Sequence, residues 1–243
     1  MTSVHESSAR REELSANLHH VHERIGFACR AAGRPRHDVI LIVVTKFFPA
    51  SDIETLCQLG VTDVGENRDQ EASAKIAALP SGVRHRLQIH FIGQVQSNKV
   101  ASLASYVDTV HSIDRLKVVR ALDRAAAAAG RDLGALVQVS LSADPVGQGR
   151  GGISPEQVGE LANRVAEAQH LTLRGVMAVA PLGVDPALAF AELATVAHAV
   201  RADHPAATWI SAGMSADLEA AVANGATHLR VGSAILGSRP PLG

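Results

Sequence analysis

The sequence predicts an α/β protein, a single (β/α)8 TIM barrel over residues 1–243 with an extra helix at its N-terminal end. Short apolar segments alternate with amphipathic helical segments along the chain, which favours parallel strands joined by right-handed crossovers. Eight apolar segments are present, the number that closes such a barrel, and 243 residues suit one barrel.

The first predicted element is a helix over 7–32, because apolar residues recur there at helical spacing before Gly33 and Pro35. This helix can cover a barrel end or replace a helix after the eighth strand. The first strand, 39–45, is a continuous β-branched run, typical of a strand buried on both faces. The remaining strands are expected over 62–65, 88–92, 107–111, 135–141, 173–180, 208–212 and 227–231. Helices are expected over 51–59, 67–79, 99–104, 114–129, 155–168, 186–202 and 216–223.

Composition excludes several classes of protein. The formal net charge is −1 and no block of basic residues occurs, so neither nucleic acid nor a membrane surface is an expected partner. The N-terminal segment lacks the apolar core of a signal peptide, and no apolar run is long enough to span a bilayer.

The cysteines and histidines bear on the cellular compartment and on metal binding. Cys29 and Cys57 fit a reducing compartment, so a cytoplasmic protein is expected. His19 and His22 can share a helix face, but no third ligand accompanies them, so no metal site is predicted.

Polar residues and glycines follow the predicted strands at their C-terminal ends, where barrels of this class place their sites. Lys46 follows the first strand and is one of four lysines against nineteen arginines. Arginine cannot act as a nucleophilic amine at neutral pH, whereas a desolvated lysine can. An apolar surrounding favours the neutral amine that attacks an aldehyde, so Lys46 is the candidate nucleophile. The alternative is a lysine whose amine simply reaches solvent at the strand end.

Two turns of small residues, SAGMS (211–215) and VGSA (231–234), follow the seventh and eighth strands, where barrels commonly bind phosphate. Glycine lets backbone N–H groups approach a phosphate, serine adds donors, and a helix N-terminus after Ser215 adds partial positive charge. Ser215 can also act as an ordinary helix cap, and the two roles are compatible.

Arg230 precedes the second of these turns on the last strand. It can pair with a carboxylate or hydrogen-bond the ring nitrogen of a bound pyridine, which keeps that nitrogen unprotonated. The glycine-rich segment 143–152 does not match the P-loop pattern, and is either a surface loop or a flap over the site mouth.

Six motifs lie in order between about residues 38 and 239: VTKFFPA (44–50), GENRDQE (65–71), HFIGQVQSNK (90–99), RGVMAVAP (174–181), SAGMSADLEAAVANGAT (211–227) and LRVGSAILGSR (229–239). Together they resemble the pyridoxal phosphate homeostasis proteins (the YggS/PROSC family), which are related to the barrel domain of alanine racemases. The resemblance implies an alanine racemase N-terminal domain-like barrel that holds pyridoxal 5′-phosphate (PLP) as a Schiff base on Lys46. It also implies further cofactor-binding residues, namely Asn67, His90, Ser211, Met214, Ser215, Arg230, Gly232 and Ser233. Arg68 departs from the tyrosine that many relatives carry there.

The resemblance implies a protein of PLP (vitamin B6) homeostasis with no catalytic residue and no robust turnover, with apo PLP-dependent enzymes as possible acceptors. The main alternative is an amino-acid racemase, which needs an acid or base on each face of the substrate α-carbon. In the racemases an additional C-terminal domain supplies a tyrosine across a dimer, whereas Tyr106, the only tyrosine here, precedes the fourth strand. A monomer is therefore expected. A third alternative is a Schiff-base aldolase or phosphosugar enzyme that uses Lys46 without a cofactor.

Overall fold

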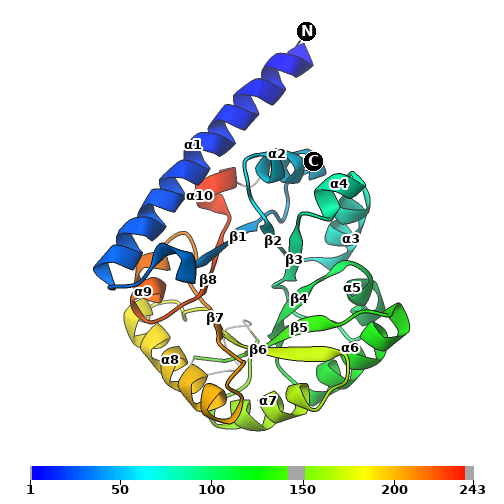
Figure 1. Ribbon diagram of the computed structural model, residues 1–243, viewed down its shortest axis with the longest axis vertical. Helices are drawn as coiled ribbons and strands as arrows, with labels where there is room; N and C mark the ends of the chain where they lie inside the picture. Colours follow the sequence, from blue (N-terminus) through cyan, green and yellow to red (C-terminus); the bar gives the residue numbers. More distant parts are fainter. Residues whose placement is uncertain (1, 142–150, 239–243) are drawn as a thin grey trace.

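The computed structural model describes residues 2–141 and 151–238, with side chains from Ser8 onward. Its eight parallel strands form one closed barrel in sequential order (Figure 1). The strands are β1 (Ile40–Val44), β2 (Asp63–Glu66), β3 (Gln88–Phe91), β4 (Thr109–Ile113), β5 (Leu133–Gln138), β6 (Leu171–Met177), β7 (Trp209–Ser211) and β8 (His228–Val231). β1 pairs with both β2 and β8, which closes the ring. The predicted fold class and strand count are confirmed.

Helices surround the barrel wall on the outside (Figure 1). They are α1 (Thr2–Ala31), α2 (Ala50–Gln58), α3 (Asp69–Ala77), α4 (Ser81–Arg84), α5 (Val100–Tyr106), α6 (Leu116–Ala129), α7 (Val158–Ala166), α8 (Pro186–Asp203), α9 (Leu218–Ala223) and α10 (Ser233–Leu236), with short 3-10 turns η1 (Arg36–Asp38) and η2 (Pro155–Gln157). The sequence did not predict α4 and α10, because a helix of one turn is too short to show a hydrophobic period.

β5 and β6 both begin and end two or three residues earlier in the sequence than expected, at Leu133–Gln138 and Leu171–Met177 instead of 135–141 and 173–180. Gly134 and Gly175 lie inside these strands, at positions where the neighbouring strand leaves no room for a side chain. A Cβ added to Gly134 would lie 2.6 Å from the Thr109 hydroxyl oxygen, and one added to Gly175 would lie 1.9 Å from the Trp209 carbonyl oxygen. The last residues of both predicted strands instead form connections at the C-terminal rim.

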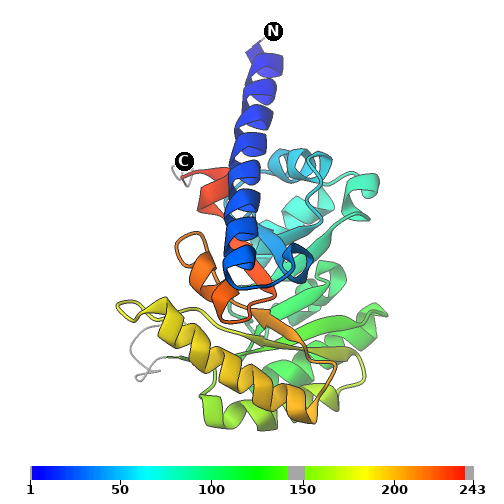
Figure 2. The same ribbon diagram turned by 60° about the vertical axis from the view of Figure 1, so that its left-hand side comes forward.

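The long helix α1 packs against α9 and α10 beside the junction of β8 with β1, and its N-terminal part extends beyond the barrel (Figure 2). Its buried apolar stripe consists of Leu14, Leu18, Val21 and Ile25. Arg24 donates two hydrogen bonds to the Glu219 carboxylate, at 2.9 and 3.0 Å. Because α10 is a single turn, α1 occupies the place of a full helix after the eighth strand.

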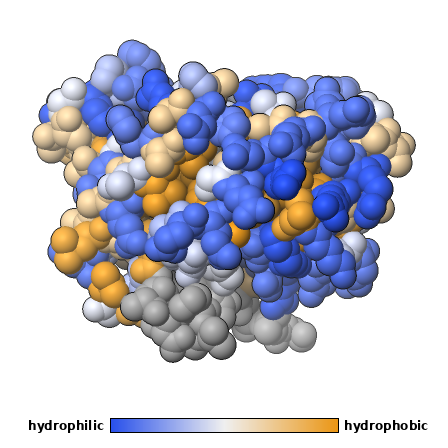
Figure 3. Space-filling model, turned by 90° about the horizontal axis from the view of Figure 1, so that it is seen from below, coloured by the Kyte–Doolittle hydropathy of each residue, from blue (hydrophilic) through white to orange (hydrophobic). Residues whose placement is uncertain are grey.

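The face of the molecule seen in Figure 3 is mostly hydrophilic, with hydrophobic residues scattered between the polar ones. Within the described ranges, no helix has the length and apolar character needed to cross a membrane.

Candidate cofactor site

Lys46 lies two residues after the end of β1, at the C-terminal rim, and is half-buried. β1 pairs Val43 with Val231 of β8, so this register brings Lys46 beside the turn that follows β8. The next residue, Phe47, has a φ of +71°, which is uncommon for a bulky side chain. Backbone strain of this kind is concentrated at functional sites.

A buried cluster of one lysine and two carboxylates holds the backbone on both sides of the candidate nucleophile. The Lys75 amine donates to the Thr45 carbonyl oxygen at 2.9 Å, to Glu66 Oε1 at 2.8 Å and to Glu71 Oε1 at 3.0 Å. The Thr45 hydroxyl donates to Glu66, and the Phe47 N–H donates to Glu71. The three side chains therefore fix the residue before and the residue after Lys46.

Burial of Glu66 raises the pKa of its carboxyl group, against the opposing effect of Lys75. Glu66 Oε2 is buried and has no hydrogen-bond partner in the described part of the chain. Sequence reasoning missed this cluster, although the scarcity of lysine was a usable signal for Lys75.

The turns after β7 and β8 lie side by side, as the sequence predicts, and their role in binding phosphate stays a prediction. The Ser233 hydroxyl donates to Ser215 Oγ at 3.2 Å, and the Ala234 N–H donates to the same oxygen at 3.3 Å. Gly232 lies close to β1, because a Cβ added there would be 3.1 Å from the Val44 carbonyl oxygen.

The helix after the first turn begins later than predicted, because α9 starts at Leu218 and Asp217 is its N-cap residue. Ser215 therefore does not cap this helix. Met214 is exposed in the same turn, and its backbone N–H donates to the Asp217 carboxylate.

Arg230 lies in the barrel interior with 4% of its surface exposed. Its Nη1 donates to Ser211 Oγ at 2.7 Å, and its Nη2 donates to the Ala178 carbonyl oxygen at 2.8 Å. Burial lowers the pKa of Arg230 to about 10, which leaves the guanidinium charged at neutral pH. No carboxylate of the described ranges forms an ion pair with it. Ser211 is fully buried, so the structure groups it with Arg230 rather than with Ser215 and Ser233.

His90 also lies in the interior, below the rim, where 1% of its surface is exposed. Its Nδ1 is 2.9 Å from His111 Nε2, and its Nε2 is 2.9 Å from Asp63 Oδ1. His111 Nδ1 in turn lies 2.9 Å from Ser211 Oγ. His90 is thus linked to Arg230 through His111 and Ser211. The sequence did not predict His111, because a single histidine within a strand forms no motif.

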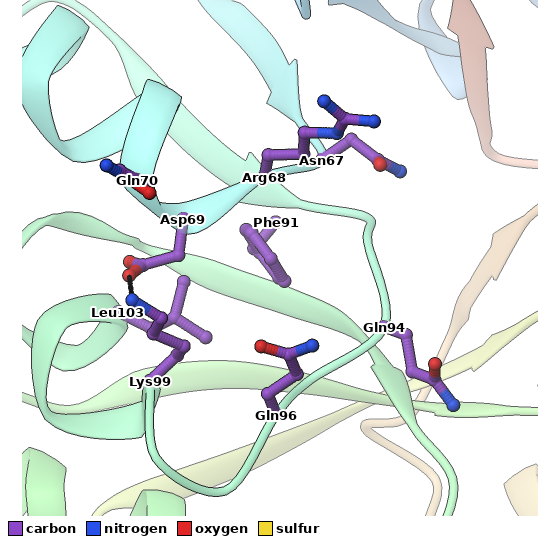
Figure 4. Close-up of a pocket in the computed structure, with 9 residues that line it drawn as sticks. All are labelled: Asn67, Arg68, Asp69, Gln70, Phe91, Gln94, Gln96, Lys99 and Leu103. Carbon is purple, nitrogen blue, oxygen red and sulfur yellow. Dashed lines mark ion pairs between the residues drawn. The ribbon is translucent and has the colours of Figure 1, made fainter.

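Asn67 contributes to a neighbouring pocket of about 310 Å³ between the connections that follow β2 and β3 (Figure 4). The two connections touch, because a Cβ added to Gly93 would lie 1.9 Å from the Asn67 carbonyl oxygen. Lys99 and Asp69 form an ion pair of 3.9 Å in the pocket wall. The Arg68 guanidinium, at the position that departs from the family pattern, lies 5.4 Å from the centroid of the Phe47 ring, and Phe47 is the residue after Lys46.

Two further predictions concern the glycine-rich segment 143–152 and a metal site. Most of the glycine-rich segment 143–152 lies outside the described residues, and its flap interpretation stays a prediction. The described residues contain no group of three or more histidine, cysteine or acidic side chains arranged to hold a metal ion.

Comparison with known proteins places this chain in a family. The family model "Alanine racemase, N-terminal domain" matches residues 37–240. A pyridoxal phosphate homeostasis protein of Mycobacterium tuberculosis is 42% identical, with 95% of this chain and 94% of the relative covered. PipY of Synechococcus elongatus, solved with PLP bound, is 32% identical, has a TM-score of 0.78 and is covered completely, together with 92% of this chain.

A Clostridium difficile alanine racemase shares the fold alone, at 14% identity and a TM-score of 0.68, with 92% of this chain and 56% of the racemase covered. The match to the family model and the identity to curated relatives agree with the motifs along the chain. This chain therefore belongs to the alanine racemase N-terminal domain family, within which its relatives are the pyridoxal phosphate homeostasis proteins.

Proposed function

We propose that this protein binds PLP as a Schiff base on Lys46 and acts in PLP homeostasis without robust catalytic turnover. The main support is the placement of Lys46 beside β8, whose following turn is joined through Ser233 to Ser215. Relatives of the chain are named pyridoxal phosphate homeostasis proteins, and the PipY structure contains PLP.

The described residues offer a complementary group for each part of the cofactor. PLP would supply an aldehyde group, and Lys46 is the amine that would hold it. Ser215 and Ser233 would hold the phosphate, in the two turns that also contain Met214 and Gly232. Arg230 would face the pyridine nitrogen, and a charged donor there would keep this nitrogen unprotonated. Asn67 lines the edge of the site, next to the connection after β3.

The racemase alternative requires a second acid or base opposite Lys46. The only tyrosine, Tyr106, is buried at the end of α5 and donates to Asp69 Oδ1 at 3.3 Å. Burial, together with the Asp69 carboxylate, raises the pKa of Tyr106. It is therefore unsuited to proton transfer at the rim, which favours a carrier over a racemase. A carrier of this kind would act as a monomer and pass PLP to apo PLP-dependent enzymes.

The test is titration of the purified protein with PLP, followed by absorbance spectroscopy. Wild type is expected to develop a visible band that borohydride removes, with incorporation of the cofactor at Lys46. Lys46→Ala is expected to abolish the band, and Lys46→Arg is the matched control that keeps the positive charge without a nucleophilic amine.

Two results would replace this proposal. A colourless wild type that instead forms a borohydride-trapped adduct with a sugar phosphate would favour the aldolase. Sustained, Lys46-dependent interconversion of alanine enantiomers would favour the racemase.

A further inference from the structure

A row of hydrogen-bonded side chains crosses the barrel interior and ends at Arg230. The contacts run from Asp63 to His90 (2.9 Å), to His111 (2.9 Å), to Ser211 (2.9 Å) and to Arg230 (2.7 Å). Asp63 is the first residue of β2, so the row begins at the opposite end of the barrel from Lys46. Its three middle members are at most 1% exposed, which excludes water as a competing partner.

One arrangement of protons satisfies every contact when both imidazoles are neutral. Arg230 can only donate, so Ser211 Oγ accepts from it and its own hydrogen is available for His111 Nδ1. His111 then carries its proton on Nε2 and donates to His90 Nδ1.

His90 completes the row by donating from Nε2 to the Asp63 carboxylate. Burial alone would raise the pKa of Asp63, but hydrogen bonds from His90 and Thr62 outweigh it and lower this pKa. Asp63 is therefore an ionised acceptor, and all donors point from the cation to the carboxylate.

We infer that Asp63, His90, His111 and Ser211 are positioning residues that orient the Arg230 guanidinium toward the ring of the cofactor. Ser211 and the Ala178 carbonyl oxygen hold two different Nη atoms, which fixes the plane of the guanidinium. Asp63 fixes the direction of the row, because without an acceptor at this end the imidazole protons can adopt the opposite orientation. The effect on a ligand rests on the proposed function, whereas the proton arrangement does not.

The first test measures the histidine tautomers of the protein without PLP, by long-range ¹H–¹⁵N NMR spectra of the imidazole rings. Both His90 and His111 are expected to carry the proton on Nε2. A proton on Nδ1 of either neutral ring would overturn the inference. This result is independent of whether the protein binds PLP.

The second test compares variants by PLP affinity and by the position of the visible band. Ser211→Ala and Asp63→Leu are expected to weaken binding about fivefold, the typical effect of one hydrogen bond, and to shift the band. Asp63→Asn retains an acceptor oxygen and should stay near wild type. His228→Gln is the matched control, since His228 is equally buried but lies 6.5 Å from His90 between ring centroids and outside the row.

Unchanged affinity and band position in both Ser211→Ala and Asp63→Leu would overturn the inference while the proposed function stands. If wild type itself fails to bind PLP, the proposed function fails, and the tautomer measurement still tests the row.

Discussion

At the scale of single residues, two of the four lysines, Lys46 and Lys75, have specific environments. The position of Lys46 at the rim could be predicted because it follows the most apolar strand. Lys75 could not, because its partners Thr45 and Glu66 meet it only after β1, β2 and α3 are assembled. The amine of Lys75 is needed for three acceptors at once, which explains its place in the interior.

Replacement of Lys75 by methionine should destabilise the protein strongly. The variant leaves the Glu66 carboxylate, whose side chain is fully buried, without its cation, and removing one partner of a buried ion pair costs about 3 kcal/mol or more. Urea unfolding measures the difference. Lys117→Met, at an exposed position, should change the free energy of unfolding by less than about 0.5 kcal/mol. Equal stability of the two variants would contradict the role of Lys75.

The barrel interior should make the protein sensitive to acid. Burial, followed by the nearby His90, lowers the pKa of His228 to about 3, and burial lowers that of His111 well below its usual value. The unfolded chain binds these protons near pH 6.5 and the folded chain does not, so stability is full above this pH and falls as the pH drops toward 3.

For His228 the expected loss is about 2 kcal/mol between pH 7 and pH 5, and His111 contributes a loss of the same sign. His228→Gln should make the fall with pH shallower by this amount, whereas His198→Gln, at an exposed position, should leave it unchanged. Urea unfolding at several pH values gives the slopes, and parallel slopes for wild type and His228→Gln would refute the expectation.

At the scale of elements, hydrophobic periodicity predicted all eight strands but not all of their ends. At β5 the expected strand begins one residue after Gly134, although Gly134 lies inside the strand and a Cβ there would lie 2.6 Å from the Thr109 hydroxyl oxygen. The single-turn helices α4 and α10 have no period to detect.

Two glycines at helix positions should respond in opposite ways to alanine. Gly130 ends α6 with a φ of +63°, where a Cβ is strained although no atom lies within 4 Å, so Gly130→Ala should destabilise by about 1 kcal/mol. Gly159 lies inside α7 without positive φ, and Gly159→Ala should stabilise by about 0.5 kcal/mol or more. Thermal unfolding of both variants checks the signs, and a loss of stability in both would contradict this account.

At the scale of the whole molecule, the barrel topology explains why the grouping of residues at the rim could be predicted. Any parallel barrel gathers the residues that follow its strands at one rim, so Lys46, Ser215 and Ser233 could be grouped in advance. The interior contacts could not, because His111 and Ser211 are 100 positions apart and meet only through the register of the closed sheet. The topology thus predicts which residues lie at the C-terminal rim, whereas side-chain packing determines the contacts in the barrel interior.

The packing of α1 has a consequence for synthesis on the ribosome. Arg24 pairs with Glu219, 195 positions later, and Asn17 donates to the carbonyl oxygen of Ile235. During translation, the apolar stripe of α1 therefore stays uncovered, and the edge of β1 that pairs with β8 stays unpaired, until nearly all of the remaining residues have emerged. Uncovered apolar surface and unpaired strand edges promote aggregation, so the nascent chain should depend on chaperones until its final strand is released.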